Sequence, residues 1–152
     1  GKVVVVGAPE EPRLALCRLY GADATVSIEE HQTPEARIAA VREAVGGYGA
    51  DLVMDCSGSP QAGPEGIEML RDGGTFVEMG QFTDAGGIDT SWHRICVKEV
   101  QLLGSWAFTP DEIDQAMGIL HTIQNDYDWS RMQREFPFSE AGVAAAKLLI
   151  SC

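Results

Sequence analysis

The regular alternation of short apolar segments with helical patterns constrains the fold of this chain more than any other feature. Residues Val3–Val6 form a continuous β-branched run, which is typical of a strand buried on both faces. Four further strand-like segments follow, separated by helical patterns. They are Ala24–Ile28, Asp51–Cys56, Thr75–Met79 and Glu99–Leu103. The pattern therefore predicts an α/β fold: a doubly wound, mostly parallel, Rossmann-like sheet of five strands joined by right-handed crossovers.

The expected helices carry recognisable start and stop signals. Thr33 and Thr109 each precede a proline, the order expected for an N-cap followed by the first helical residue. We expect the first of these two helices to end at Gly46 and the second to bury Ile113, Met117 and Leu120. Two shorter helices are predicted over Arg13–Tyr20 and Glu65–Leu70. The residues from 82 to 94 are rich in Gly and Asp and predict an irregular loop.

The loop after the first strand lacks a glycine-rich phosphate-binding sequence. The chain runs from Gly7 to Pro12 without a GxGxxG pattern, whose backbone N–H groups and following helix N-terminus would bind a pyrophosphate. Pro9 and Pro12 have no N–H to donate, and Glu10 and Glu11 place negative charge where phosphate would lie. We therefore interpret the chain as a cofactor domain that lacks its first strand.

Composition excludes several classes of function. The formal net charge is −12, which argues against a nucleic-acid partner because phosphate contacts need clustered Lys and Arg. No apolar run approaches the length of a membrane span, and no signal segment stands at the N-terminus, so we expect no membrane association. Four widely spaced cysteines favour a reducing cytoplasm and form no zinc-binding pattern with the three histidines. These cysteines are Cys17, Cys56, Cys96 and Cys152.

The strand–helix alternation ends near residue 124. We therefore assign residues 1–124 to the Rossmann-like domain and residues 125–152 to a C-terminal extension packing on it, so that the chain is one domain overall. Within the extension we expect an extended piece over Met132–Phe138 and a helix over Ser139–Ile150.

Four stretches, in order, resemble the cofactor domain of the zinc-type medium-chain alcohol and polyol dehydrogenases. The segment Arg13–Ala24 resembles the helix and turn after that family's second strand, and Asp51–Gly58 resembles its fourth strand. The segment Leu70–Gly80 resembles its fifth strand with the preceding turn, and Leu103–Trp106 the end of its sixth. The likeness covers residues 2–124, and more weakly Phe136–Leu149. Relative to the family, the chain lacks the catalytic domain with its zinc ligands, the first cofactor strand and the glycine loop.

The resemblance implies a cofactor site at the carboxyl ends of the strands, where open α/β sheets bind ligands. Cys56, Ser57 and Gly58 resemble the family segment beside the adenosine and its ribose. The nicotinamide would be bracketed by residues at the ends of the last two strands. These are Gly80, Gln81, Gly104, Ser105 and Trp106. Glycine at such positions lets the backbone approach a flat ring. The alternative is that these glycines only terminate strands.

The resemblance leaves the choice between NAD and NADP open. The family usually holds the adenosine ribose with an acidic residue at the end of its second strand, where this chain has Gly7. Gly7 and the nearby Arg13 favour NADP, whereas Glu10 and Glu11 disfavour its 2′-phosphate. We expect NAD or NADP binding to be weak or absent in this chain, and zinc only in the missing catalytic domain.

No catalytic residue and no metal ligand is assigned. Trp92 and His93 are candidates for a catalytic role, but an exposed loop histidine is more often structural. Asp55 at a strand end is either a buried carboxylate with a raised pKa or, more simply, a residue that bonds to its own loop.

Two structural expectations follow from the resemblance. With the family's first strand missing, we expect strands 1 and 3 of this chain to pair and give the order 2-1-3-4-5, another common doubly wound order. In addition, the segment 95–103 resembles a family strand region that pairs across a two-fold axis. Ile95–Val97 and Val100–Leu102 would then form a homodimer edge.

Two interpretations of the function stay open, with a third less favoured. The first is an incomplete cofactor-domain portion of an NAD(P)-dependent alcohol or polyol dehydrogenase, not catalytic alone. The second is a stand-alone α/β module derived from that family that binds or interacts without catalysis. An FMN-binding or response-regulator-like domain is disfavoured because the chain has neither a phosphate loop nor an acidic triad. Whether the chain is an enzyme, and which small-molecule substrate a complete enzyme would use, is open at this point.

Overall fold

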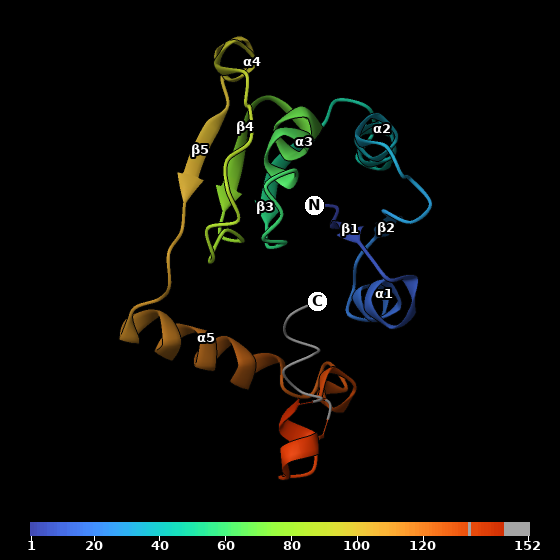
Figure 1. Ribbon diagram of the computed structural model, residues 1–152, viewed down its shortest axis with the longest axis vertical. Coiled ribbons are helices and arrows are strands. Elements are labelled where there is room, and N and C mark those ends of the chain that lie inside the picture. Colours follow the sequence, from blue (N-terminus) through green and yellow to red (C-terminus); the bar gives the residue numbers. More distant parts are fainter. Residues whose placement is uncertain (134, 145–152) are drawn as a thin grey trace. The chain divides into compact units, whose positions relative to one another are not determined.

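A computed structural model describes residues 1–133 and 135–144 (Figure 1). It has two compact units, Gly1–Glu112 and Ile113–Cys152. Five strands, all within the first unit, alternate with helices. The elements are β1 (Val4–Gly7), η1 (Glu10–Leu14), α1 (Ala15–Leu19), β2 (Ala24–Ser27), α2 (Pro34–Ala44), β3 (Ala50–Asp55), α3 (Ala62–Met69), β4 (Leu70–Glu78), α4 (Trp92–Val97), β5 (Gln101–Gly104), α5 (Pro110–Ile123) and η2 (Trp129–Met132). The α/β class and the five strands are confirmed.

The strands form two parallel sheets. One has the order β1-β2 and the other the order β3-β4-β5. The neighbours predicted within each sheet are therefore present, but the predicted pairing of β1 with β3 is wrong. The expectation that the first strand is buried on both faces is also wrong, because Val6 is 37% exposed and Val3 lies outside β1. An apolar strand must have its side chains buried by neighbouring elements, and here helices bury part of β1. The apolar pattern does not specify that a second neighbouring strand must do so.

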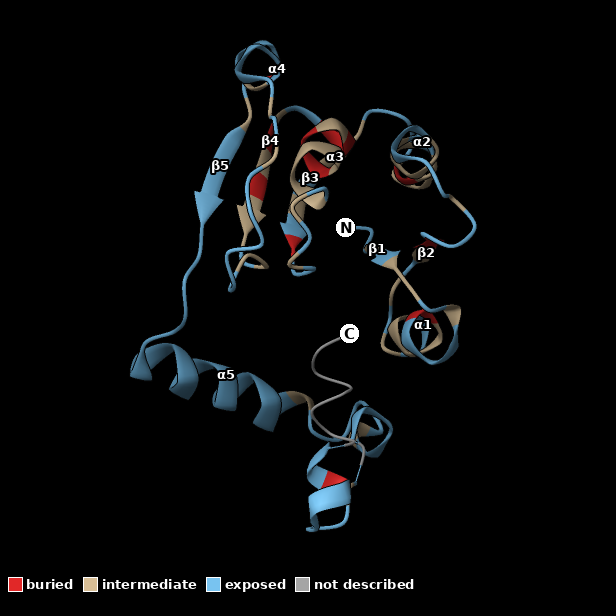
Figure 2. Cartoon of the chain, viewed as in Figure 1, coloured by how far each residue is buried: buried red, intermediate tan, exposed pale blue. Residues whose placement is uncertain are grey.

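Two apolar clusters form the core of the first unit. Val26 on β2, Val41 on α2 and Met69 on α3 make one cluster. Ile67 and Leu70 make the other with Phe76 on β4. The half-buried Val53 on β3 packs against both clusters. Figure 2 shows buried residues on β3, β4 and α3.

Helix α2 begins as the sequence predicts and is tied to α3. The Thr33 hydroxyl accepts the Ala36 N–H at 3.2 Å, with Pro34 at the first helical position. Arg37 forms a two-fold hydrogen-bonded ion pair with Glu65 on α3 at 2.7 and 2.8 Å, with both side chains mostly buried. This pair fixes α2 against α3.

Two segments differ from the sequence prediction. The expected helix over 13–20 begins earlier, as η1 at Glu10 followed by α1. Trp92–Val97 is helix α4 rather than a loop and strand edge, because Ser91 caps it by accepting the Arg94 N–H at 3.4 Å. The predicted strand character of Ile95–Val97 is therefore wrong, whereas Gln101–Gly104 is the edge strand β5.

Helix α5 carries the predicted cap. Thr109 and Glu112 form a capping box in which the carboxylate accepts the Thr109 N–H at 2.6 Å; this bond lowers the pKa of Glu112. Ile113, Met117 and Leu120 are all exposed within the second unit, so nothing in that unit buries them, and their burial stays a prediction. Beyond α5, helix begins at residue 140 and is described to residue 144; the remainder of the helix predicted up to Ile150 lies outside the described residues. The packing of residues 125–152 on the cofactor-type domain stays a prediction.

Candidate functional site

The loops that follow the parallel strands β3 and β4 are in backbone contact at two glycines, Gly58 and Gly80. A Cβ at Gly80 would lie 2.7 Å from the Gly58 nitrogen and 2.9 Å from the Ser57 nitrogen. Gly58 itself has a φ of +70°, which favours glycine. The glycines therefore do more than terminate strands, because the loops after β3 and β4 touch backbone to backbone.

Two carboxylates hold these loops in place. Asp55, buried at the end of β3, accepts the Ser57 N–H at 2.7 Å. Glu78, at the end of β4, accepts the N–H groups of Gly80 at 2.8 Å and Gln81 at 3.0 Å. The loop-bonding alternative given for Asp55 is thus the arrangement observed. Its other oxygen, Oδ2, is buried and has no hydrogen-bond partner among the described residues.

The ends of β4 and β5 border a cavity of about 860 Å³. The Ser105 N–H donates to the Glu78 carbonyl at 2.9 Å and so continues the alignment of the two strands beyond β5. The rings of Phe82 and Trp106 stack at the cavity with centroids 5.2 Å apart and an angle of 11° between their planes. A cavity of this size with apolar and aromatic walls suits a small flat ligand.

The structure brings together some of the predicted cofactor residues. Gln81, Gly104 and Trp106 line the cavity. Ser57, Gly58 and Gly80 form the backbone contact between the two loops, and Ser105 joins β5 to β4. None of these four residues lines the cavity. Cys56 is an exposed thiol just after β3. Gly7 and Arg13 belong to the other sheet's end and contribute nothing to the cavity lining.

Several cavity residues were not predicted from the sequence. The loop between β4 and α4 supplies Phe82, Asp84, Ile88 and Asp89, and α3 supplies Gly63. The residues of this loop have no periodic pattern that could have predicted them. The one available clue was an aromatic residue directly after the Gly80-Gln81 strand end.

The end of β1 has a different character. A Cβ at Gly7 would be 3.5 Å from Leu14, an ordinary contact, so no backbone crosses there. Glu10 is held in an ion pair by Arg18, and α1 is only five residues long with no side-chain cap. The residues present do not fit a pyrophosphate, because the loop presents carboxylates and prolines rather than a row of N–H groups.

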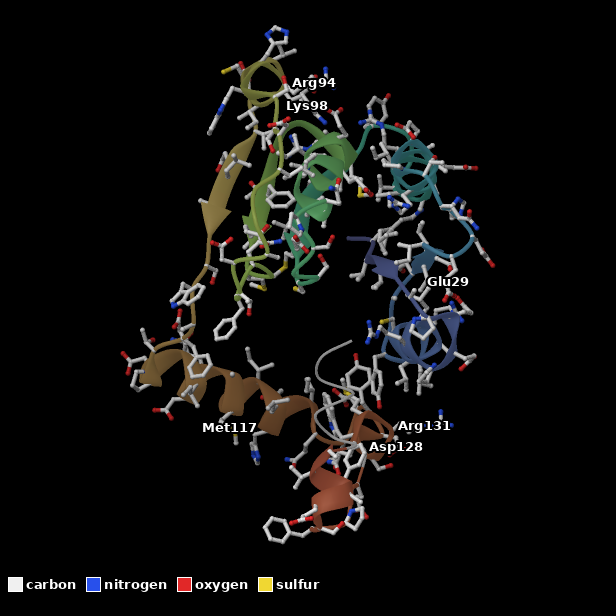
Figure 3. The ribbon with its side chains drawn as sticks, viewed as in Figure 1. Glu29, Arg94, Lys98, Met117, Asp128 and Arg131 are labelled. Carbon is white, nitrogen blue, oxygen red and sulfur yellow. The ribbon has the colours of Figure 1, made fainter. Side chains whose placement is uncertain are left out.

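A charged cluster supports α3 from its C-terminal end. Glu68 forms a two-fold hydrogen-bonded ion pair with Arg94 at 2.6 and 2.8 Å, and this bond is the main cause that lowers the pKa of Glu68. The ammonium of Lys98, a residue only 4% exposed, donates to the Ile67 carbonyl at 2.6 Å; burial lowers its pKa. Figure 3 shows Arg94 and Lys98 near each other on α4 and the residue after it. Cations at a helix C-terminus stabilise its free carbonyls, so the cluster is structural.

Neither a zinc-binding group nor a membrane-spanning helix is present among the described residues. Within residues 1–133 and 135–144, no three His, Cys, Asp or Glu side chains come together as a metal-binding group. In the same residues, no helix has the length and apolar character needed to cross a bilayer.

Comparison with known proteins identifies relatives of one type. A sequence model described as zinc-binding dehydrogenase matches residues 1–122. The chain is 27% identical over 98% of its length to sorbitol dehydrogenase of Halalkalibacterium halodurans, covering 45% of that protein. It is 30% identical over 87% of its length to 5-exo-hydroxycamphor dehydrogenase of Pseudomonas putida, covering 37%. The chain thus spans less than half the length of these curated relatives.

Solved structures agree on the fold. An alcohol dehydrogenase from Thermotoga maritima has a TM-score of 0.72 at 26% identity, covering 80% of this chain and 33% of that one. An alcohol dehydrogenase zinc-binding domain protein from Burkholderia ambifaria has a TM-score of 0.76 at 22% identity, covering 95% of this chain and 38% of that one. The second likeness shows the fold alone.

Proposed function

Because this chain belongs to the zinc-binding dehydrogenase family, we propose that it is the nicotinamide-facing portion of the cofactor domain of an NAD(P)-dependent alcohol or polyol dehydrogenase. The observation that carries the proposal is the cavity at the ends of β4 and β5, with Gln81, Gly104 and Trp106 in its wall. When bound, the cofactor supplies hydride transfer. The chain's own part is to hold and orient the flat ring through strand-end backbone and the aromatic pair.

The same proposal implies that the chain alone does not oxidise alcohols. Hydride transfer in the zinc-type family needs a metal to polarise the substrate oxygen, and the described residues offer no metal-binding group. Cofactor affinity also depends on the pyrophosphate, which the β1 end does not fit. We therefore expect dissociation constants of about a millimolar or weaker for NAD and NADP.

Calorimetric titration with both cofactors tests this proposal. The matched variant is Gly104→Val, because Gly104 lines the cavity and a Cβ at this position meets no atom within 4 Å. We expect Gly104→Val to keep the wild-type circular dichroism spectrum and to lose the weak binding. Micromolar binding by the wild type, or zinc-dependent turnover by this chain alone, would overturn the proposal.

A non-catalytic binding or interaction module is the second candidate. It is favoured by the acidic, proline-containing β1 end, which disfavours a phosphate-bearing ligand. The two candidates differ in one observation: a coding sequence that continues into a region bearing Cys and His zinc ligands supports the enzyme. Among the described residues, the cysteines Cys17, Cys56 and Cys96 are free thiols, which supports a reducing compartment, and we propose the cytoplasm.

We also propose that the chain self-associates through β5. This strand pairs with β4 on one edge, and all four of its residues are exposed, including Leu103 at 52%. An unpaired apolar edge is satisfied by a symmetric copy. By sedimentation, Leu103→Lys should shift a dimer toward monomer, whereas the control Met117→Lys on the exposed face of α5 should not. A wild-type chain that stays monomeric at high concentration would contradict this.

A further inference from the structure

The aromatic pair at the cavity leaves ring faces open to a ligand. Phe82 and Trp106 stack on each other, yet the two residues are 72% and 71% exposed. A flat ligand can extend such a stack on its outer face. The face of an indole ring carries negative electrostatic potential and attracts cations more strongly than the other aromatic side chains do.

The charged residues around the cavity have one sign. Glu78, Asp84 and Asp89 line it, and its lining contains no Lys, Arg or His among the described residues. Backbone N–H groups fix two of these carboxylates. Glu78 accepts from Gly80 and Gln81, and Asp84 accepts from Gly86 at 2.9 Å. The wall therefore presents fixed negative charge next to an aromatic face.

We propose that this cavity selects a flat ring that carries a positive charge, such as an N-alkylated pyridinium, over the same ring without charge. The inference rests on the proposed function and deepens it, because the oxidised nicotinamide ring is a pyridinium and the reduced ring is neutral. Both the indole face and the carboxylates attract the cation, and both interactions weaken when the ring loses its charge.

A charge series of small ligands tests the preference. The probes are 1-methylnicotinamide, which is cationic, nicotinamide, which is neutral, and nicotinate, which is anionic at pH 7.5. Binding to the full chain is followed by ¹H–¹⁵N NMR through the indole N–H of Trp106. At low salt we expect the cation to bind about five-fold tighter than the neutral ring, the size of an exposed cation–π contact. Nicotinate should bind weakest, and added salt should reduce the difference.

Charge-removing variants identify the groups responsible. Asp84→Asn with Asp89→Asn should lower the cation preference, since it removes the negative charge while asparagine can still accept the Gly86 N–H. The control is Glu29→Gln with Glu30→Gln, which removes the same charge from the exposed loop after β2 (Figure 3 labels Glu29). The control should keep the preference.

The outcomes separate this inference from the proposed function. Equal binding of the cation and the neutral ring would overturn the charge preference and leave the nicotinamide-facing role intact. Failure of every ring to shift the Trp106 signal would overturn both. A preference lost equally in the Asp84/Asp89 and Glu29/Glu30 variants would show an effect of net charge alone and would also overturn the inference.

Discussion

The carboxyl ends of the two sheets differ in how tightly they are built. At the β3-β4-β5 end, Gly58 and Gly80 touch through their backbones, carboxylates hold the loops, and the ends of β4 and β5 border a cavity. At the β1-β2 end, Gly7 has ordinary contacts, and its loop presents Glu10 and Glu11. Ligands of open α/β folds bind at the carboxyl ends of the strands, so both of these regions are possible ligand sites. The difference teaches that, of these two ends, the first has loops packed backbone to backbone beside a cavity, whereas the loop at the second presents carboxylates and prolines.

The largest expected effect contrasts one glycine at each end. Gly80→Ala places a Cβ 2.7 Å from the Gly58 nitrogen, where only backbone could move. We expect a loss of roughly 3 kcal/mol in the free energy of unfolding. Gly7→Ala meets only Leu14 at 3.5 Å and should change stability by less than about 0.5 kcal/mol. Urea denaturation of both variants measures this. Equal losses at the two sites would erase the contrast between the strand ends.

A second pair of variants tests whether the tight packing extends beneath the β3-β4-β5 sheet. In α3, Gly66→Ala would bring a Cβ within 2.4 Å of the buried Phe76 ring, whereas Gly63→Ala meets nothing within 4 Å. We expect Gly66→Ala to cost about 2 kcal/mol. Gly63→Ala should be neutral or stabilise by about 0.5 kcal/mol because alanine has the higher helix propensity. If Gly66→Ala raised the melting temperature, the helix–sheet interface would be looser than described.

The smallest expected effect concerns pH. The Arg94 hydrogen bond lowers the pKa of Glu68 below its ordinary value of 4.5. A carboxylate with a lowered folded-state pKa stabilises the fold above pH 4.5, and this contribution is lost as the pH falls through the folded-state pKa. Glu68→Gln should therefore cost about 1 kcal/mol at pH 7 and become nearly silent in acid.

The control for the pH effect is Glu43→Gln on the exposed face of α2. Its unfolding free energy should follow the wild type across the pH range. A Glu68→Gln penalty that persists unchanged well below pH 4 would show that packing rather than the ion pair causes it.

Sequence alone determined much of the local structure of this chain, although not η1 or α4. Thr33 with Pro34, and Thr109 with Pro110, marked helix starts because a cap acts within one turn. The β-branched runs marked strands, and four ordered segments marked the family. The strand ends at Gly58, Gly80 and Gly104 were identified for the same local reason.

Tertiary structure decided what lies between these elements. Whether β1 pairs with β3, and whether Ile113 or Met117 is buried, depends on neighbours far along the chain that no local pattern encodes. The cavity joined Gln81 and Trp106 to Phe82, Asp84 and Asp89, residues of a loop without periodicity. The sequence pattern identified Gly80 as a strand end. Only the packed structure shows why this residue must be glycine: the Gly58 backbone lies too close to leave room for a Cβ. Steric exclusion acts between atoms in space and not between positions in sequence.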